Sequence, residues 1–237
     1  MQVQYKKFYS VGVNFILAFM LMALTMIVSI EPIMSVSTNS QAKVYYNGDT
    51  TESNVTFMIN VYWGNEYLEG MLNEFSKRGL KTTFFVGGMW VVKYPELLQE
   101  IQAKGNEIGN HGYFHKEQSK LTYSKNQDEI LNTHNIVREY TGLNMTLFAP
   151  PSGDFSDVTV EVATNLGYKT IMWTRDTIDW RDKDADIIYS RAIKNLSNGD
   201  LVLMHPTFAT LEALPRILDY CIKKGFNVTT VSENLGG

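Results

Sequence analysis

Two histidines that could share a metal ion stand four positions apart, at His111 and His115, directly after the short run 108–110. Side chains at positions i and i+4 lie on one side of a helical turn, and a compact loop can also bring them together. Because imidazole nitrogens bind divalent cations, the pair predicts a metal site. The alternative is a pair of surface histidines, or of histidines satisfied by ordinary hydrogen bonds. A third histidine, His205, also follows an apolar run.

The chain around these histidines repeats one unit. From residue 55 onward, an amphipathic helix pattern ends at a glycine and gives way to a short apolar run. The glycines are Gly79, Gly105, Gly142, Gly167, Gly199 and Gly225. Since glycine readily takes the left-handed conformation that ends a helix, the repeat predicts about seven strands alternating with helices. This order indicates a mostly parallel sheet with right-handed crossovers, as a closed or distorted (β/α) barrel or as an open doubly wound sheet.

Both architectures gather their chemistry where strands end and βα loops begin. The predicted loops span residues 60–64, 87–90, 111–115, 149–153, 174–180 and 205–206. They contain most of the histidines and tryptophans of the chain. His134 is the exception among the histidines, because it lies in the middle of a predicted helix. We expect His134 to be structural or exposed.

Length and composition narrow the class of protein. The 237 residues, 44% hydrophobic and 19% charged, are enough for one domain of catalytic size. The net charge of −4 argues against nucleic acid as a partner. Cys221 has no partner for an internal disulfide, so we expect it to pack as a small hydrophobe. The first predicted strand is followed by no glycine-rich phosphate loop, which argues against a phosphate or nucleotide enzyme.

The N-terminal residues 1–31 read as a signal anchor. Residues 8–30 carry no charge and are long enough, at about 1.5 Å per residue, to cross a hydrocarbon core of roughly 30 Å. Lys6 and Lys7 before this run predict that the N-terminus is cytoplasmic and the rest extracytoplasmic and membrane-anchored. Cleavage of the segment would give a secreted form instead. Residues 32–54 are rich in polar residues and predict a linker, with the folded domain at 55–237.

Five segments, in this order, resemble the motifs of the polysaccharide deacetylases, carbohydrate esterase family 4, in particular the branch associated with sporulation. The matching segments are 82–87, 107–115, 150–153, 176–180 and 203–205. The resemblance covers roughly residues 55–235. It implies a distorted (β/α) barrel of about seven βα units. It also implies metal-dependent removal of acetyl groups from a cell-wall glycan, such as peptidoglycan or a chitin-like oligosaccharide.

The first motif departs from the family pattern. Members usually carry Thr-Phe-Asp-Asp-Gly, in which the first Asp is the general base and the second a metal ligand. Aligned on Gly64, this sequence has Tyr62 and Trp63 in those places, and Ala149 replaces the Arg that opens the third motif. A phenol cannot take up a proton at neutral pH, and an indole offers a cation no lone pair.

The resemblance assigns the remaining roles residue by residue. His111 and His115 would hold a Zn, Co or Ni ion, and His205 would be the general acid. We expect Asp176 or Asp179 to hold the imidazole of His205 in its donating tautomer.

Two further residues are candidates for the missing groups. Asn60 could offer an amide oxygen as a further metal ligand, and Asp154 could replace the base. Each of these, like Asp179, also fits an ordinary turn or strand end.

The expected sugar contacts are Tyr62, Trp63, Trp90, Pro151, Trp180 and Leu203. Aromatic rings suit sugar faces, although core packing explains any one of them as well. Two functions follow. The first is a metal-dependent hydrolase of carbon–nitrogen bonds that deacetylates the glycan. The alternative is a degenerate homologue that binds glycan or a cell-wall partner without turnover.

Overall fold

The computed structural model describes residues 42–236, which belong to one compact unit, Ser40–Gly237. The predicted anchor at 8–30 and the first part of the predicted linker lie outside the described residues. Among residues 42–236, no helix combines the length and the apolar character that crossing a membrane requires.

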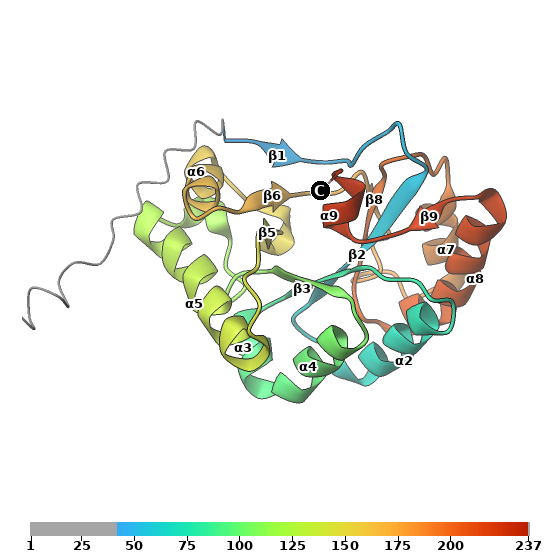
Figure 1. Ribbon diagram of the computed structural model, residues 1–237, viewed down its shortest axis with the longest axis horizontal. Helices are drawn as coiled ribbons and strands as arrows, with labels where there is room; N and C mark the ends of the chain where they lie inside the picture. The colour runs from blue at the N-terminus through green and yellow to red at the C-terminus, as the bar shows by residue number, and fades with distance from the viewer. Residues whose placement is uncertain (1–41, 237) are drawn as a thin grey trace, which may run out of the picture. The chain divides into compact units, whose positions relative to one another are not determined.

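Within residues 42–236, nine strands form one sheet in the order β1-β6-β5-β4-β3-β2-β8-β7, with β9 paired to β2. The strands are β1 (Val44–Tyr45), β2 (Asn54–Val61), β3 (Thr83–Val86), β4 (Glu107–Asn110), β5 (Leu147–Phe148), β6 (Lys169–Ile171), β7 (Arg175–Asp176), β8 (Leu201–Met204) and β9 (Asn227–Val228). All their pairings are parallel. The sheet curls into a half-barrel with helices along its outer side (Figure 1), which is consistent with the predicted distorted (β/α) barrel.

The helices follow the strands as the repeat predicts. They are α2 (Asn65–Ser76), α3 (Gly88–Lys93), α4 (Pro95–Ala103), α5 (Tyr123–Thr141), α6 (Asp157–Asn165), α7 (Ala185–Ile193), α8 (Phe208–Lys224) and α9 (Val231–Asn234), with short 3₁₀ turns η1 (Gln118–Lys120) and η2 (Pro151–Gly153). Gly142 and Gly225 end α5 and α8 with φ of 73° and 79°. The left-handed glycine stop read from the sequence is therefore confirmed at these two helices.

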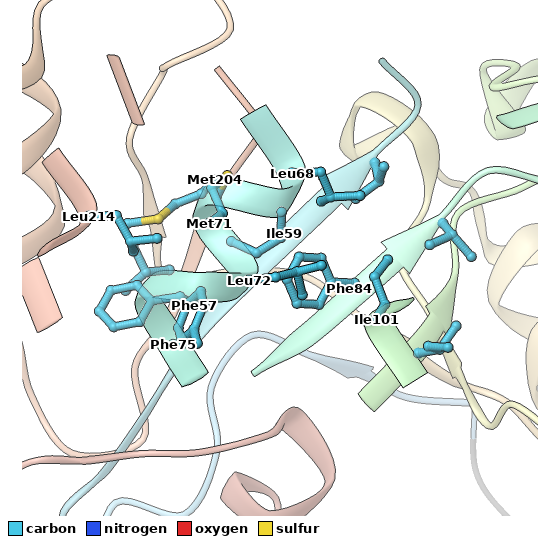
Figure 2. Close-up of a cluster of buried hydrophobic side chains, with 14 of the residues drawn as sticks. Phe57, Ile59, Leu68, Met71, Leu72, Phe75, Phe84, Ile101, Met204 and Leu214 are labelled. Atoms are coloured by element: carbon cyan, nitrogen blue, oxygen red, sulfur yellow. The ribbon is translucent and has the colours of Figure 1, made fainter. Parts of the chain in front are cut away.

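Strand β2 divides the core into two parts, because alternate residues of a strand point to opposite sides. Phe57 and Ile59 face outward and pack with Leu72 and Phe75 of α2, as Figure 2 shows. Met58 faces inward and belongs to a smaller apolar cluster that fills the barrel. The other buried members of this cluster are Phe85, Leu147, Ala149, Ile171, Leu201 and Val231. Asn60, two residues after Met58, continues the inward face to the end of the strand.

The folded unit begins before residue 55, so residues 44–54 are not a free linker. Val44 and Tyr45 pair with Thr170 and Ile171 of β6 at the edge of the sheet. Gly48 lies so close to Asn234 that a Cβ at position 48 would meet the Asn234 Oδ1 at 2.2 Å. A strand of two residues carries no periodic pattern, which is why the sequence did not reveal it.

Candidate active site

A pocket of about 440 Å³ opens at the carboxyl ends of the parallel strands. Its walls come from the ends of β2, β7 and β8, from the loops that follow β2, β4, β6, β7 and β8, and from η2. The lining residues are Asn60, Tyr62, Trp63, His111, His115, Ser152, Gly153, Trp173, Asp176, Trp180, Leu203 and His205. The layer of strand ends that the sequence indicates is therefore where these side chains meet.

His111 is a buried, neutral imidazole whose orientation is fixed by the backbone. The backbone N–H of His111 donates to the Val86 carbonyl, and the ring Nδ1 lies 2.7 Å from the carbonyl oxygen of Ala149. A carbonyl only accepts, so Nδ1 donates, and Nε2 keeps its lone pair. Burial, reinforced by the neighbouring His115, lowers the pKa of His111 to about 3. His111 is therefore ready to accept a hydrogen bond or to bind a cation.

His115 reaches the same pocket from a loop and not from a helical turn. Its φ is 55°, and its ring centroid lies 5.0 Å from that of His111. Burial, together with the neighbouring His205, lowers the pKa of His115. The carboxylate of Glu129 in α5 supports the loop, because its Oε2 accepts the N–H groups of Tyr113 and Phe114 at 2.8 Å each. Of the two geometries considered for this pair, the compact loop is the one found.

His205 and Asp179 form an oriented pair. The Asp179 carboxylate accepts the His205 Nδ1–H at 2.8 Å and the His205 backbone N–H at 2.6 Å. It also accepts the hydroxyl of Thr210 at 2.6 Å, and it is almost fully buried. The contact fixes which nitrogen of His205 faces the carboxylate, and Nε2 is left free on the ring. Of the two aspartates considered for this role, Asp179 holds the imidazole; Asp176 instead accepts the Ile178 N–H at 2.7 Å.

Tyr62 and Trp63 line the pocket beside the histidines. The Tyr62 ring lies 4.9 Å from the ring of His115, and burial, with a smaller effect of Glu129, raises the pKa of its hydroxyl. Trp63 stacks on His205 with ring centroids 5.7 Å apart and planes 5° apart. Tyr62 therefore stays protonated at neutral pH, and Trp63 covers one face of His205.

The side chains present fall short of a catalytic metal site. Catalytic zinc sites usually have three protein ligands, and here His111 and His115 supply two imidazoles. No cluster of three or more His, Cys, Asp or Glu suited to a metal ion occurs within residues 42–236. Asn60 lines the pocket and its buried Oδ1 has no hydrogen-bond partner, but an amide oxygen is a weaker ligand than a carboxylate. The Zn, Co or Ni ion stays a prediction.

Three predicted site residues lie elsewhere. Both carboxylate oxygens of Asp154 accept from Ser119, from its N–H and its hydroxyl at 2.7 Å each, so this residue does not serve the pocket. Trp90 is buried in the core and donates from its Nε1 to Asn65 Oδ1 at 2.5 Å. Pro151 is buried and does not line the pocket, whereas the next residue, Ser152, lines it and takes a φ of 56°.

Some residues that line or support the pocket were not predicted from the sequence. Trp173, the second residue after β6, lines the pocket and lies one residue outside the predicted loop. Gly153 makes room for it, since a Cβ at position 153 would lie 2.6 Å from the Trp173 ring. Glu129 and Thr210 act through helices that pack behind the site, and nothing in their local sequence marks them. His134 bonds the Tyr168 hydroxyl at 2.6 Å outside the pocket, which confirms its structural role.

Comparisons of sequence relate the chain to known proteins. Residues 47–171 match the family model described as polysaccharide deacetylase. The uncharacterized protein YlxY of Bacillus subtilis is 38% identical over 81% of this chain, which spans 60% of that relative's length. A peptidoglycan-N-acetylglucosamine deacetylase of Bacillus cereus is 32% identical over 65% of this chain and 75% of its own.

Comparison of structures gives a neighbour of the same kind. A CE4 family pseudoenzyme from Bacillus anthracis has a TM-score of 0.80 and 35% identity, with 82% of this chain and 69% of that chain covered. A mutant of that protein, described as a CE4 family pseudoenzyme with restored enzymatic activity, superimposes with the same TM-score of 0.80 at 34% identity, covering 82% and 72%.

Proposed function

Because the chain belongs to the polysaccharide deacetylase family, we propose that its strand-end pocket binds an acetylated cell-wall glycan of the peptidoglycan type and does not hydrolyse it efficiently. One observation carries this proposal. Tyr62 and Trp63 line the pocket at the two positions where the family resemblance places the general base and a metal-binding carboxylate.

Amide hydrolysis needs an activated water, stabilisation of an oxyanion and a proton for the leaving amine. His205, oriented by Asp179, suits the last of these tasks. Tyr62 cannot act as a base near neutral pH, because burial raises the pKa of its hydroxyl. Asp154 is held by Ser119 and supplies no substitute. The pocket thus retains a proton donor without the base that would start the reaction.

The same pocket suits the binding of sugars. Ligand sites are typically concave and mostly apolar, with a few placed polar groups. Here Trp63, Trp173 and Trp180 offer aromatic surface, and Trp63 and Trp180 are 43% and 55% exposed. The Nε2 of His111 keeps a lone pair that can accept a hydrogen bond from an N-acetyl or hydroxyl group.

A second candidate function is slow deacetylation. It is favoured by the intact contact between His205 and Asp179, which has no evident value for binding alone. In that case Asp176, which lines the pocket, or a second water molecule would take the proton of the attacking water. We also place the folded unit outside the cytoplasm, in keeping with a cell-wall ligand and with the apolar run at 8–30.

Calorimetry and acetate release on the full chain test both functions. With acetylated muropeptides and chitooligosaccharides as ligands, we expect measurable affinity and no acetate with or without added metal, from the parent protein and from His205→Ala alike. Asp154→Asn serves as the matched control away from the pocket. Acetate release that His205→Ala abolishes would favour the second function. Absence of affinity for every ligand would overturn the first.

A further inference from the structure

A second cavity, of about 450 Å³, lies directly beside the histidine pocket. Trp63 and Trp180 line both cavities, so each indole forms part of the partition between them. A ligand that extends past these two rings would pass from one cavity into the other. The second cavity is therefore continuous with the proposed glycan site.

The far wall of this cavity is aromatic. Phe208, the first residue of α8, is 58% exposed, and its ring packs at an angle on Tyr67 of α2, with centroids 6.2 Å apart. Exposed aromatic side chains gathered around one hollow commonly mark a binding surface. This wall suits methyl and methylene groups.

Three ionisable side chains line the cavity, and one of them, Asp179, is already engaged by His205 and Thr210. The other two are Glu66 and Lys183, and neither forms an ion pair within residues 42–236. Gly64, with a φ of 80°, directly precedes α2, and Glu66 stands in the first turn of that helix. Lys183 favours a carboxylate, and Glu66 favours an ammonium group.

We infer that this second cavity binds the peptide stem of the peptidoglycan whose sugar occupies the histidine pocket. The inference rests on the proposed function. A stem peptide carries carboxylates, an amino group and small apolar side chains on a sugar, which matches the charges, the aromatic wall and the shared partition. A second neutral sugar would use the aromatic wall but would leave Glu66 and Lys183 without charged partners.

Three ligands separate these possibilities when titrated against the full chain. They are a disaccharide carrying its peptide, the same disaccharide with the peptide removed, and a neutral chitotetraose. We expect the peptide to raise affinity about tenfold over the bare disaccharide, the size of one or two partly exposed charge contacts. Lys183→Gln and Glu66→Gln should each remove several-fold of that gain and leave the affinity for the bare disaccharide unchanged. Lys223→Gln and Glu161→Gln, exposed charges on α8 and α6, are the matched controls.

Each result decides a different point. Equal affinity with and without the peptide overturns the inference while the proposed function stands. A peptide gain that survives both Lys183→Gln and Glu66→Gln also overturns it, because the peptide then binds elsewhere. A gain for chitotetraose that Phe208→Ala removes, without any gain for the peptide, assigns the cavity to a second sugar. Absence of affinity for all three ligands overturns the proposed function and this inference together.

Discussion

At the scale of single residues, Trp63 is the side chain that most alters the site. Its indole stacks on His205 and stands where the family resemblance places a metal-binding carboxylate. We expect Trp63→Asp to complete a set of two imidazoles and one carboxylate with His111 and His115. The affinity of metal-stripped protein for Zn²⁺ or Co²⁺ should rise at least about tenfold, the usual weight of one ligand or its support. Trp180→Asp, on the same pocket wall, is the control, and equal affinities would contradict the assignment.

Tyr62 defines a second test at this scale. Replacing Tyr62 and Trp63 together by Asp should produce acetate release from an acetylated glycan, since general-base catalysis typically contributes about 10² to 10⁴ in rate. Adding His205→Ala should remove that activity, because His205 is the oriented proton donor. Adding Asp154→Asn should not, because its carboxylate accepts from Ser119. A double variant as inert as the parent would show that more than these two side chains is missing.

At the scale of elements, α5 supports the loop that carries the paired histidines. Glu129 accepts two backbone N–H groups of that loop with one carboxylate oxygen, in a buried place. Glu129→Ala should lower the free energy of unfolding by about 1–3 kcal/mol, the cost of leaving buried donors without partners. Urea denaturation measures this, with Glu139→Ala on the exposed side of α5 as control. Equal loss in both variants would mean that the loop does not depend on Glu129.

The helices and strands could be predicted where a periodic hydrophobic pattern is long. The site residues could be predicted where they stand close together in a sequence motif. The strand and helix alternation after residue 55 and the grouping of His111, His115 and His205 both follow from the sequence. Strand β1 escaped because it is only two residues long and gains its stability from β6. Trp90, predicted to contact sugar, is buried, and Trp173, for which the sequence predicted no role, lines the pocket. The burial of a tryptophan depends on what packs across from it and not on its own neighbours in the chain.

At the scale of the whole molecule, buried histidines couple stability to pH. His111 has a folded pKa of about 3, below its ordinary value of 6.5, so the unfolded chain binds the proton more readily. The free energy of unfolding should therefore fall as pH decreases from about 6.5 toward 3, by up to about 1.4 kcal/mol per pH unit from this group. Urea titrations of metal-stripped protein at several pH values measure it. His111→Asn should flatten the slope, and an unchanged slope would contradict the burial argument.

Cys221 lies in the larger hydrophobic cluster and can report whether α8 stays packed. It is fully buried in α8, and burial raises the pKa of its thiol to about 12. Because the thiolate is the reactive form, a thiol reagent at pH 8 should label native protein far more slowly than protein in denaturant. Rapid labelling of the native protein would show that α8 opens readily from the sheet.

Gly64 lets the backbone of the loop that carries Trp63 lie close to the backbone of the loop that carries His205. Its φ is 80°, and a Cβ there would lie 1.9 Å from the Pro206 carbonyl oxygen, so the spacing between these loops depends on glycine and not on the residues beside it. The neighbouring side chains can therefore change without disturbing that spacing. Tyrosine and aspartate codons differ only at the first base, whereas tryptophan and aspartate codons differ at every base. A lineage with this scaffold could therefore gain a carboxylate at position 62 by a single base change, whereas a carboxylate at position 63 requires three base changes.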